Sequence, residues 1–402
     1  MPNPYQQMAP ASLYIHIPFC RAKCLYCDFV SFAGREVRKP AYFAALHAEI
    51  RAQAALLARE GKLRPLNSLY FGGGTPSDVP AADIARTVEL VRSLWGFTED
   101  PEITLEANPG TTNPESLKQL WVAGINRLSI GLQSGNDKLL RKIGRIHTLQ
   151  DFIATVEAAR AVGFTNISTD LMTGLPGQTL TDVRDSVQLL LDLGVQNISF
   201  YALIIEEGTP FAIMVKEGRM QDLPDEDLER DMYELSRRML TDAGFVHYEV
   251  SNSGLPGYEG RHNTVYWHGE PYAACGLAAV SYIDGVRRTN TDDLEEYIRL
   301  FADATDEVDA FAGVVETDVI DEEEAQLEFF LLGFRMLDGV SIADFRERFG
   351  IQPPERIQKS LAYLLENRFI TASGEERDGF FERYRLTRLG LDVANFVFME
   401  FV

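Results

Sequence analysis

The chain is poor in cysteine and in positive charge, and it has no long apolar run. Four cysteines in 402 residues are too few for a disulfide framework and fit a reducing compartment. No apolar run approaches the roughly 18 residues of a membrane-spanning helix, and residues 1–11 lack the basic and apolar regions of a signal peptide. We therefore expect a cytoplasmic protein without a membrane span. The net charge of −22 argues against nucleic acid as a partner, because phosphate backbones are bound by clustered cations.

Three of the four cysteines, Cys20, Cys24 and Cys27, lie together directly after a short apolar run. Three thiolates cannot all pair as disulfides, and a structural zinc ion needs a fourth ligand, which His16 or Asp28 would have to supply. A cube-shaped 4Fe-4S cluster held by three cysteines instead leaves one iron open for another molecule. The CxxxCxxC spacing is typical of radical S-adenosylmethionine (SAM) enzymes. We favour this interpretation over the zinc site and over chance clustering.

Strands and helices alternate along the first half of the chain. Apolar, β-branched runs predict strands, and the segments between them have helical spacing. Six such units predict a parallel sheet with right-handed crossovers. Because a closed barrel needs eight, we expect an α/β fold with a partial (β/α)6 TIM-like barrel and a site at the carboxyl ends of the strands. The predicted strands are residues 13–17, 68–71, 102–106, 127–130, 167–171 and 198–203, and the predicted helices are residues 41–59, 81–95, 152–161 and 183–193.

Three successive glycines, Gly72, Gly73 and Gly74, end the second predicted strand. Glycine permits positive φ and close approach of a ligand to the backbone, with exposed amides, and Pro76 fixes the exit of the turn. A triple glycine alone is often only a flexible turn. Beside the cysteine loop, it is a candidate for gripping the amino group of SAM.

Charged and polar residues follow the later predicted strands. A charged group that faces a barrel interior has to be paired or bound by a ligand. SAM carries an ammonium, a carboxylate, a sulfonium and ribose hydroxyls, all of which such side chains could bind. The alternative is a structural salt-bridge network among Glu106, Arg145 and Asp170. Gln133 and Ser134 complete the set.

Five stretches of the sequence carry a resemblance to a known family: YIHIPFC (14–20), FGGGTPS (71–77), RLSIGLQS (127–134), DLMTGLPGQT (170–179) and RHNTVYW (261–267). Residues 12–203 resemble the radical SAM core of the coproporphyrinogen dehydrogenase (HemN)-like family, and the whole chain is similar to its HemW-like branch. The resemblance implies that Cys20, Cys24 and Cys27 hold a 4Fe-4S cluster whose open iron is chelated by SAM. It also implies SAM contacts at the matching positions Tyr14, Gly73, Gly74, Thr75, Glu106, Gln133, Arg145, Asp170 and Ala202, with Tyr26 packed beside SAM.

The residues after Cys27 distinguish the branches of this family. HemN-type dehydrogenases carry a further cysteine two residues on and a long N-terminal extension, whereas here Asp28 and Phe29 follow and the first strand begins near residue 12. Both features resemble the HemW-like branch, whose assigned role is to bind heme and deliver it to acceptor proteins. The resemblance thus implies heme as cargo and heme-acceptor proteins as partners. Further expectations are a homodimer and peripheral association with respiratory proteins.

A second class of function stays open at this point. The chain is alternatively a radical enzyme, an oxygen-independent coproporphyrinogen III dehydrogenase that oxidatively decarboxylates propionates. An intact set of SAM-contacting positions favours this alternative, and Asp28 and Phe29 favour the heme carrier.

The segment with His262, Tyr266 and Trp267 is the candidate heme contact. Imidazole is a good axial ligand for heme iron, and aromatic side chains offer apolar faces to a porphyrin. Alternatively, His262 hydrogen-bonds within a folded loop and Trp267 packs in the core. The chain departs from the family further on, where Val280 replaces a histidine. That departure leaves Cys275 as either a thiolate ligand or, as we favour, a buried inert thiol.

The remaining sequence predicts a separate small unit. An acidic stretch indicates a linker. After it, the sequence predicts an α+β winged-helix-like domain from an amphipathic helix, two further segments and a β-like run. It lacks a basic recognition face, so a lid or docking role is favoured over DNA binding. The linker is residues 303–321, and the later segments are 322–337, 341–349, 354–367 and 380–386. We divide the chain into a radical SAM core (1–240), an extension with the His262 motif and the linker (241–320), and a HemN-type C-terminal domain (321–402).

Overall fold

A nine-stranded sheet forms the centre of the protein in a computed structural model, which describes residues 9–302 and 309–402. The strand order is β7-β8-β6-β5-β4-β3-β2-β1-β9, and β1 to β6 run parallel to one another. This arrangement confirms the predicted α/β fold with a partial barrel. The six strands are β1 (Ser12–Ile17), β2 (Leu66–Gly73), β3 (Phe97–Ala107), β4 (Arg127–Gln133), β5 (Asn166–Thr173) and β6 (Asn197–Ala202).

Three short strands that the sequence analysis missed extend both edges of the sheet. β9 (Ala273–Cys275) pairs in parallel with β1, and β8 (Asn252–Gly254) pairs antiparallel with both β6 and β7 (Val246–Glu249). Strands of three or four residues are too short to show a two-residue period. The sheet therefore continues beyond residue 240, while the proposed domain boundaries themselves stay a prediction.

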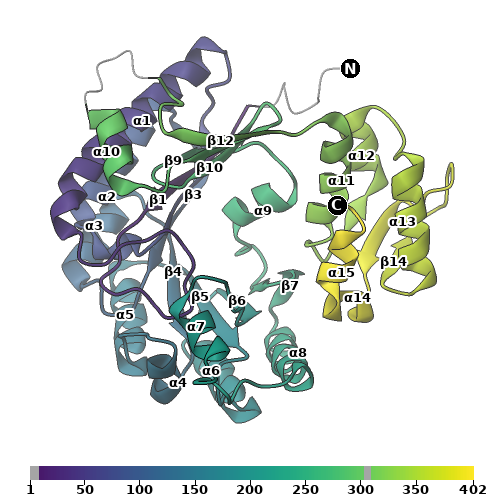
Figure 1. Ribbon diagram of the computed structural model, residues 1–402, viewed down its shortest axis with the longest axis horizontal. Helices are drawn as coiled ribbons and strands as arrows, with labels where there is room; N and C mark the ends of the chain where they lie inside the picture. The colour runs from purple at the N-terminus through teal and green to yellow at the C-terminus, as the bar shows by residue number, and fades with distance from the viewer. Residues whose placement is uncertain (1–8, 303–308) are drawn as a thin grey trace.

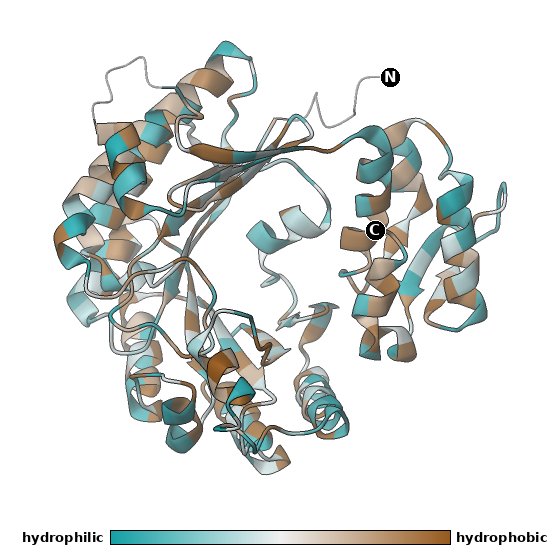
Figure 2. Ribbon diagram, viewed as in Figure 1, coloured by the Kyte–Doolittle hydropathy of each residue, from teal (hydrophilic) through white to brown (hydrophobic). Residues whose placement is uncertain are grey.

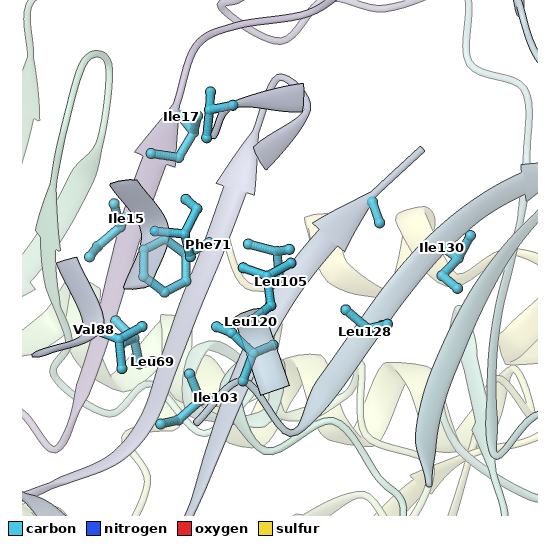
Figure 3. Packing of buried hydrophobic residues seen from close by; sticks show 14 of the residues in the cluster. Ile15, Ile17, Leu69, Phe71, Val88, Ile103, Leu105, Leu120, Leu128 and Ile130 are labelled. Atoms are coloured by element: carbon cyan, nitrogen blue, oxygen red, sulfur yellow. The ribbon is translucent and has the colours of Figure 1, made fainter. Parts of the chain in front are cut away.

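The outer face of the sheet is covered by helices (Figure 1). Strand residues that point outward are apolar, so Leu69 and Phe71 of β2 and Leu105 of β3 pack toward buried residues such as Val88 and Leu120 of the helices (Figure 3). Side-chain capping boxes at Asn113, Thr148 and Thr179 begin three of these helices. The helices of this part are α1 (Lys39–Arg59), α2 (Ala81–Leu94), α3 (Pro114–Ala123), α4 (Asp137–Lys142), α5 (Leu149–Val162), α6 (Leu180–Asp192), α7 (Pro210–Lys216), α8 (Glu226–Asp242), α9 (Arg261–Trp267) and α10 (Leu294–Ala302).

The inner face of the sheet is polar and aromatic. Successive strand residues point to opposite faces, so Tyr14, Tyr70 and Glu106 alternate with the apolar residues of the outer face. Tyr14 lies opposite Tyr70 in the β1–β2 register, and their rings stack with centroids 6.1 Å apart. The inner face is thus built from side chains that need polar partners or ligands.

The expected acidic linker at residues 303–321 is wrong for part of its length. Residues 303–308 lie outside the described residues, but Val314–Val319 forms β12, which pairs antiparallel with β11 (Val286–Asn290), itself paired with β10 (Val280–Ile283). Asp318 lies opposite Arg287 in this register, but the Arg287 guanidinium donates both of its hydrogen bonds to Glu328, and β12 is mostly exposed. The acidic residues therefore belong to an exposed edge strand.

The C-terminal part forms a small α+β domain with its own core. Its sheet has the order β13-β15-β14, and Phe330, Phe345 and Phe401 are buried in a separate apolar cluster. The predicted helix over 322–337 ends earlier, at Gly333. The elements are α11 (Glu322–Gly333), β13 (Val340–Ser341), α12 (Ile342–Phe349), α13 (Glu355–Glu366), β14 (Ile370–Ser373), β15 (Arg383–Leu386), α14 (Arg388–Asp392) and α15 (Ala394–Met399).

Hydropathy distinguishes the helices of the core from one another. Helix α8 is mainly hydrophilic in Figure 2, since its buried residues are limited to Met232, Ser236 and Leu240.

Across residues 9–302 and 309–402, none of the helices has the length and apolar character needed to cross a membrane.

Glu49 on α1 fixes the turn that follows β9. Its buried carboxylate accepts hydrogen bonds from the Gly276 amide (2.7 Å), the Asn290 side chain (2.6 Å) and the Tyr297 hydroxyl (2.5 Å). Burial nevertheless raises the pKa of Glu49 from its ordinary value to about 7. A carboxyl group in helix α1 thereby positions residues far away in the sequence.

The buried Glu49 predicts that stability falls as the pH rises. Between pH 5 and 7 the folded protein keeps a proton on Glu49 that the unfolded chain has lost. The contribution of protonated Glu49 to the free energy of unfolding is therefore complete below the unfolded pKa and is lost as the pH rises past about 7. We expect Glu49→Gln to flatten this dependence by up to about 1.4 kcal/mol per pH unit. Urea unfolding at pH 5 and pH 7.5 measures the slope. The exposed Glu89→Gln is the control, and equal slopes in all three proteins would contradict the assignment.

Candidate functional site

The three clustered cysteines lie in a loop that leaves β1 and closes on itself. The Phe32 amide donates to the Pro18 carbonyl (2.8 Å), and the Cys20 amide donates to the Phe32 carbonyl (3.0 Å). The Leu25 amide donates to the Ile143 carbonyl (3.1 Å), which ties the loop to the end of α4. These contacts place the cysteines at the carboxyl ends of the parallel strands, as the sequence predicts.

One cavity, which we call the cluster cavity, brings most of the predicted site residues together. Glu106 and Asp170 reach it from β3 and β5, and Arg145 reaches it from the loop after α4. Its lining includes Cys20, Cys24, Tyr26, Cys27, Gly73, Gly74, Thr75, Glu106, Gln133, Arg145 and Asp170. Which of these residues touch SAM stays a prediction.

Two of the sulfurs in this cavity receive hydrogen bonds from polar side chains. The Thr75 hydroxyl donates to Cys20 Sγ (3.4 Å), and Arg145 Nη1 donates to Cys24 Sγ (3.7 Å). Burial raises the pKa of the Cys27 thiol to about 11, so a thiolate here needs a cation. Hydrogen bonds to sulfur are a common feature of protein-bound iron–sulfur clusters. The donor set therefore fits such a cluster.

The alternative zinc site finds no support at His16. Its Nε2 lies 2.8 Å from the Val30 carbonyl and its Nδ1 lies 3.2 Å from the Tyr14 hydroxyl, so both ring nitrogens are engaged. In the described part of the chain, no three His, Cys, Asp or Glu side chains, the three cysteines included, converge closely enough to hold a single metal ion. A 4Fe-4S cluster differs from zinc in this respect, because each cysteine binds a different iron and the sulfurs lie further apart.

The glycine loop packs against the cysteine loop more tightly than the sequence suggested. Gly73 has φ of 109°, and a Cβ there would lie 2.5 Å from the His16 ring. Its amide donates to Glu106 Oε2 (3.2 Å), and the Gly74 amide donates to the Ile17 carbonyl (2.9 Å). The expectation of exposed amides is therefore wrong. The glycines are needed because a Cβ at Gly73 would collide with His16 of β1, and a Cβ at Gly74 would lie 2.8 Å from the Phe19 carbonyl of the cysteine loop.

Burial of Glu106 and Asp170 makes the cavity electrostatically unusual. Glu106 accepts hydrogen bonds from the Tyr70 hydroxyl (2.8 Å) and the Gly73 amide, yet burial raises its pKa to about 7. Burial also raises the pKa of Asp170, and the positive charge of Arg145 opposes that rise. Both carboxyl groups would gain from a ligand with positive charge.

The alternative salt-bridge network among Glu106, Arg145 and Asp170 does not form in the described part of the chain. Arg145 Nη2 donates instead to Asn108 Oδ1 (2.7 Å) and to the Gly131 carbonyl (2.6 Å). The buried Arg145 Nε has no hydrogen-bond partner. An unpaired buried donor is costly, and a bound ligand could accept the hydrogen bond of Arg145 Nε. The arrangement therefore favours the ligand-binding interpretation over the salt-bridge network.

Three residues that the sequence did not single out complete the site. Tyr70 donates a hydrogen bond to Glu106, Asn108 accepts one from Arg145, and Tyr201 lines the cavity. Tyr70 and Tyr201 lie on the inner face next to apolar outward residues, so strand alternation is the signal that could have found them. Gln133 adopts φ of 68° where the pairing of β4 and β5 shifts register.

Two predicted SAM contacts lie outside the lining of the cluster cavity. Tyr14 points to a neighbouring hollow, which we call the aromatic depression, and Ala202 lines a groove on the opposite edge of the core. The aromatic depression has a volume of about 480 Å³, and Phe29 lines both it and the cluster cavity. Its apolar walls include Tyr14, Phe29, Tyr266, Trp267, Tyr272 and Val280.

The structure favours a structural position for His262. Its ring is buried, with Nδ1 2.8 Å from the Ser68 hydroxyl and Nε2 2.8 Å from the Tyr266 hydroxyl. Burial lowers the pKa of His262 to about 3. Tyr266 and Trp267, in contrast, both line the aromatic depression, so Trp267 is not a core residue. Cys275 is fully buried in β9, which agrees with the inert thiol.

The site and fold define a radical SAM protein. Residues 14–190 match the sequence profile of the Radical SAM superfamily, and residues 320–393 match that of the HemN C-terminal domain. This superfamily implies a 4Fe-4S cluster and SAM. The solved structure of coproporphyrinogen III oxidase (HemN) from Escherichia coli shares the fold, with a TM-score of 0.81 and 22% identity over 98% of this chain and 90% of that chain.

The more particular relationship comes from curated relatives. The Heme chaperone HemW of Lactococcus lactis is 33% identical over 98% of this chain and 97% of the relative. The Heme chaperone HemW of Bacillus subtilis is 37% identical over 84% of this chain and 87% of the relative. The chain belongs to the HemW family.

The contact between Gly73 and His16 predicts a severe effect of a single methyl group. Gly73→Ala would place Cβ 2.5 Å from a ring that is fixed by two hydrogen bonds, so we expect a loss of about 2 kcal/mol or more beyond backbone strain. Gly163→Ala is the matched control, because it has a similar φ of 125° but its Cβ would lie 3.4 Å from Trp121. Urea unfolding compares the two variants. Equal losses of stability would show that strain alone matters at Gly73.

Proposed function

We propose that this protein is a heme chaperone, which binds heme and transfers it to acceptor proteins while it carries a SAM-bound 4Fe-4S cluster. The aromatic depression beside the cluster cavity is the observation that carries the proposal, because an open apolar surface suits a ligand that must be both held and released. The names of the HemW relatives support it. A cytoplasmic location, a homodimer and peripheral association with respiratory proteins stay predictions.

In this proposal, Cys20, Cys24 and Cys27 hold the cluster, and SAM lies over the glycine loop. The cluster, when bound, would supply an electron to the SAM sulfonium. Glu106 and Asp170 offer negative charge to the SAM cation, and Arg145 Nε is a free donor for its carboxylate. Gly73 and Gly74 let the glycine loop pack against His16 and Phe19, which a Cβ at either position would prevent.

Heme would lie against Tyr266 and Trp267 in the aromatic depression. His262 positions Tyr266 through the 2.8 Å contact between Nε2 and the tyrosine hydroxyl. Phe29 is 64% exposed, and it occupies the position where HemN-type dehydrogenases carry their further cysteine. An exposed aromatic ring there extends the apolar surface toward the cluster.

The second candidate function is an oxygen-independent coproporphyrinogen III dehydrogenase. The well-formed cluster cavity, with buried Glu106, Asp170 and Arg145 around it, favours this alternative. Radical decarboxylation of a propionate also requires the substrate to be enclosed, and the aromatic depression is open.

The cysteine assignment predicts a selective loss of the cluster. Anaerobic reconstitution of the variant with Cys20, Cys24 and Cys27 all replaced by alanine should give neither bound iron and sulfide nor the broad visible absorbance of a cluster. Cys275→Ala is the matched control, since that thiol is buried in β9 away from the cavity, and it should keep the full cluster content. Stoichiometric iron and sulfide in the triple variant, or zinc in anaerobically purified protein, would contradict the assignment.

The chaperone proposal predicts heme binding without coproporphyrinogen oxidation. Reconstituted protein with SAM, a reductant and coproporphyrinogen should yield no protoporphyrinogen, whereas heme should co-elute with the protein in gel filtration. Trp267→Ala should weaken heme binding about tenfold, because an aromatic contact of about 1 kcal/mol or more is lost. Trp121→Ala, on the outer helix α3, is the control. Formation of protoporphyrinogen would instead support the dehydrogenase.

A further inference from the structure

A groove separates the core from the C-terminal domain, and the proposed function does not use it. It lies between β6 and α8 on one side and α14 and α15 on the other, and its volume is about 590 Å³. Phe200, Ala202, Phe396 and Phe398 contribute apolar walls. Tyr201 lines both this groove and the cluster cavity. The inter-domain groove therefore adjoins the cluster cavity, and Tyr201 lies between the two.

Arg335 lines this groove, and its guanidinium stacks on two aromatic rings. Its guanidinium carbon lies 4.2 Å from the centroid of the Trp267 ring and 5.6 Å from that of Phe398. Its carbonyl accepts a hydrogen bond from the Val250 amide (3.0 Å), which fixes the backbone after α11. A planar cation held against two aromatic rings is oriented in advance for a planar anion.

The Arg335 side chain has no hydrogen-bond or ion-pair partner among the described residues. Its Nε is buried and without an acceptor. The negative charge of Glu249 acts on Arg335, and Glu249 Oε2 is likewise buried without a partner. In contrast, Arg230 in the same groove donates to Asp227 (3.2 Å). Arg335 is thus a fixed, half-buried cation whose donors await an acceptor.

The surroundings restrict what that acceptor can be. A chain with a net charge of −22 repels free anions, so an anion must gain affinity from other contacts. The apolar walls of the groove offer such contacts to a ligand with an apolar body. The guanidinium fork matches a carboxylate, with two parallel hydrogen bonds.

We propose that Arg335 binds a propionate group of heme at the edge of the inter-domain groove. The class of ligand rests on the proposed function, and the inference adds the residue that recognises the acid groups. Trp267 connects this anchor to the aromatic depression, because its ring lines the depression and also contacts the guanidinium. The C-terminal domain then contributes to heme binding through Arg335 and Phe398.

Heme and its dimethyl ester separate this role from simple packing. Both carry the same ring and iron, but only heme offers carboxylates. Spectroscopic titration of the cluster-loaded full chain should show tighter binding of heme than of the ester. Arg335→Gln should weaken heme binding about tenfold to a hundredfold, as for a hydrogen bond between charged groups, and should change ester binding by less than about twofold. Arg335→Lys, which keeps the charge and loses the fork, should fall between the two.

Arg288→Gln is the matched control, because Arg288 also stacks on an aromatic ring, 4.4 Å from the Phe311 centroid, but lies on β11 away from the groove. It should leave both affinities unchanged. Equal losses for heme and ester in Arg335→Gln would assign Arg335 a packing role, and no loss for either would leave it as a water-bridged partner of Glu249. Both results would overturn the inference.

The same titration distinguishes failure of this inference from failure of the proposed function. A wild-type protein that binds heme and ester equally tightly would keep its function as a heme carrier and lose the Arg335 anchor. A wild-type protein that binds neither would overturn the carrier function and the anchor together. Thermal unfolding of each variant shows whether it is folded. If Arg335→Gln does not fold, the comparison between heme and its ester is made with Arg335→Lys instead.

Discussion

The two-residue period of the parallel strands is the constraint on which the rest of this structure depends. Outward residues such as Leu69 of β2 and Leu105 of β3 are apolar. The residue that follows each of them on its own strand, Tyr70 or Glu106, must therefore face inward. A closed eight-stranded barrel would fill its interior with packed apolar side chains. Here the open sheet keeps buried charges on its inner face, and hydrogen bonds such as that from Tyr70 to Glu106 relieve their desolvation only in part. A ligand that carries complementary charge would relieve it further.

The open side of the same sheet explains how one fold can present two different surfaces. The cluster cavity lies at the carboxyl ends of the strands and is lined by the buried charges of Glu106, Arg145 and Asp170. The aromatic depression is lined mainly by aromatic side chains, and the inter-domain groove combines apolar walls with charged residues such as Arg230 and Arg335. Phe29 joins the cavity to the depression, and Tyr201 joins it to the groove. A carrier needs such surfaces at the exterior, where a large flat ligand can enter and leave without unfolding its host.

Sequence reasoning predicted the fold and the cluster loop because both depend on local patterns. Residues with strong two-residue periods and the spacing of Cys20, Cys24 and Cys27 are visible without any tertiary information. The satisfied amides of Gly73 and Gly74 were missed because their partners, Glu106 and Ile17, lie on two other strands. The strand at residues 314–319 was missed because its partner, not its composition, makes it a strand. The position of Arg335 between Trp267 and Phe398 depends on domain packing, which no local pattern records.

The number of protons released when SAM binds tests the central electrostatic claim most directly. Burial raises the pKa of Glu106 to about 7, so at pH 6 the free protein keeps this group mostly protonated. A bound cation favours the ionised form and expels the proton. Calorimetry of SAM binding to the cluster-loaded wild type and to Glu106→Gln, in buffers of different ionisation enthalpy, measures that number, and the difference between the two proteins removes the proton that the SAM ammonium loses when it chelates iron. We predict that the wild type releases more protons than Glu106→Gln at pH 6 and that the difference declines toward zero above pH 8. Equal proton release by the two proteins at pH 6 would contradict the account.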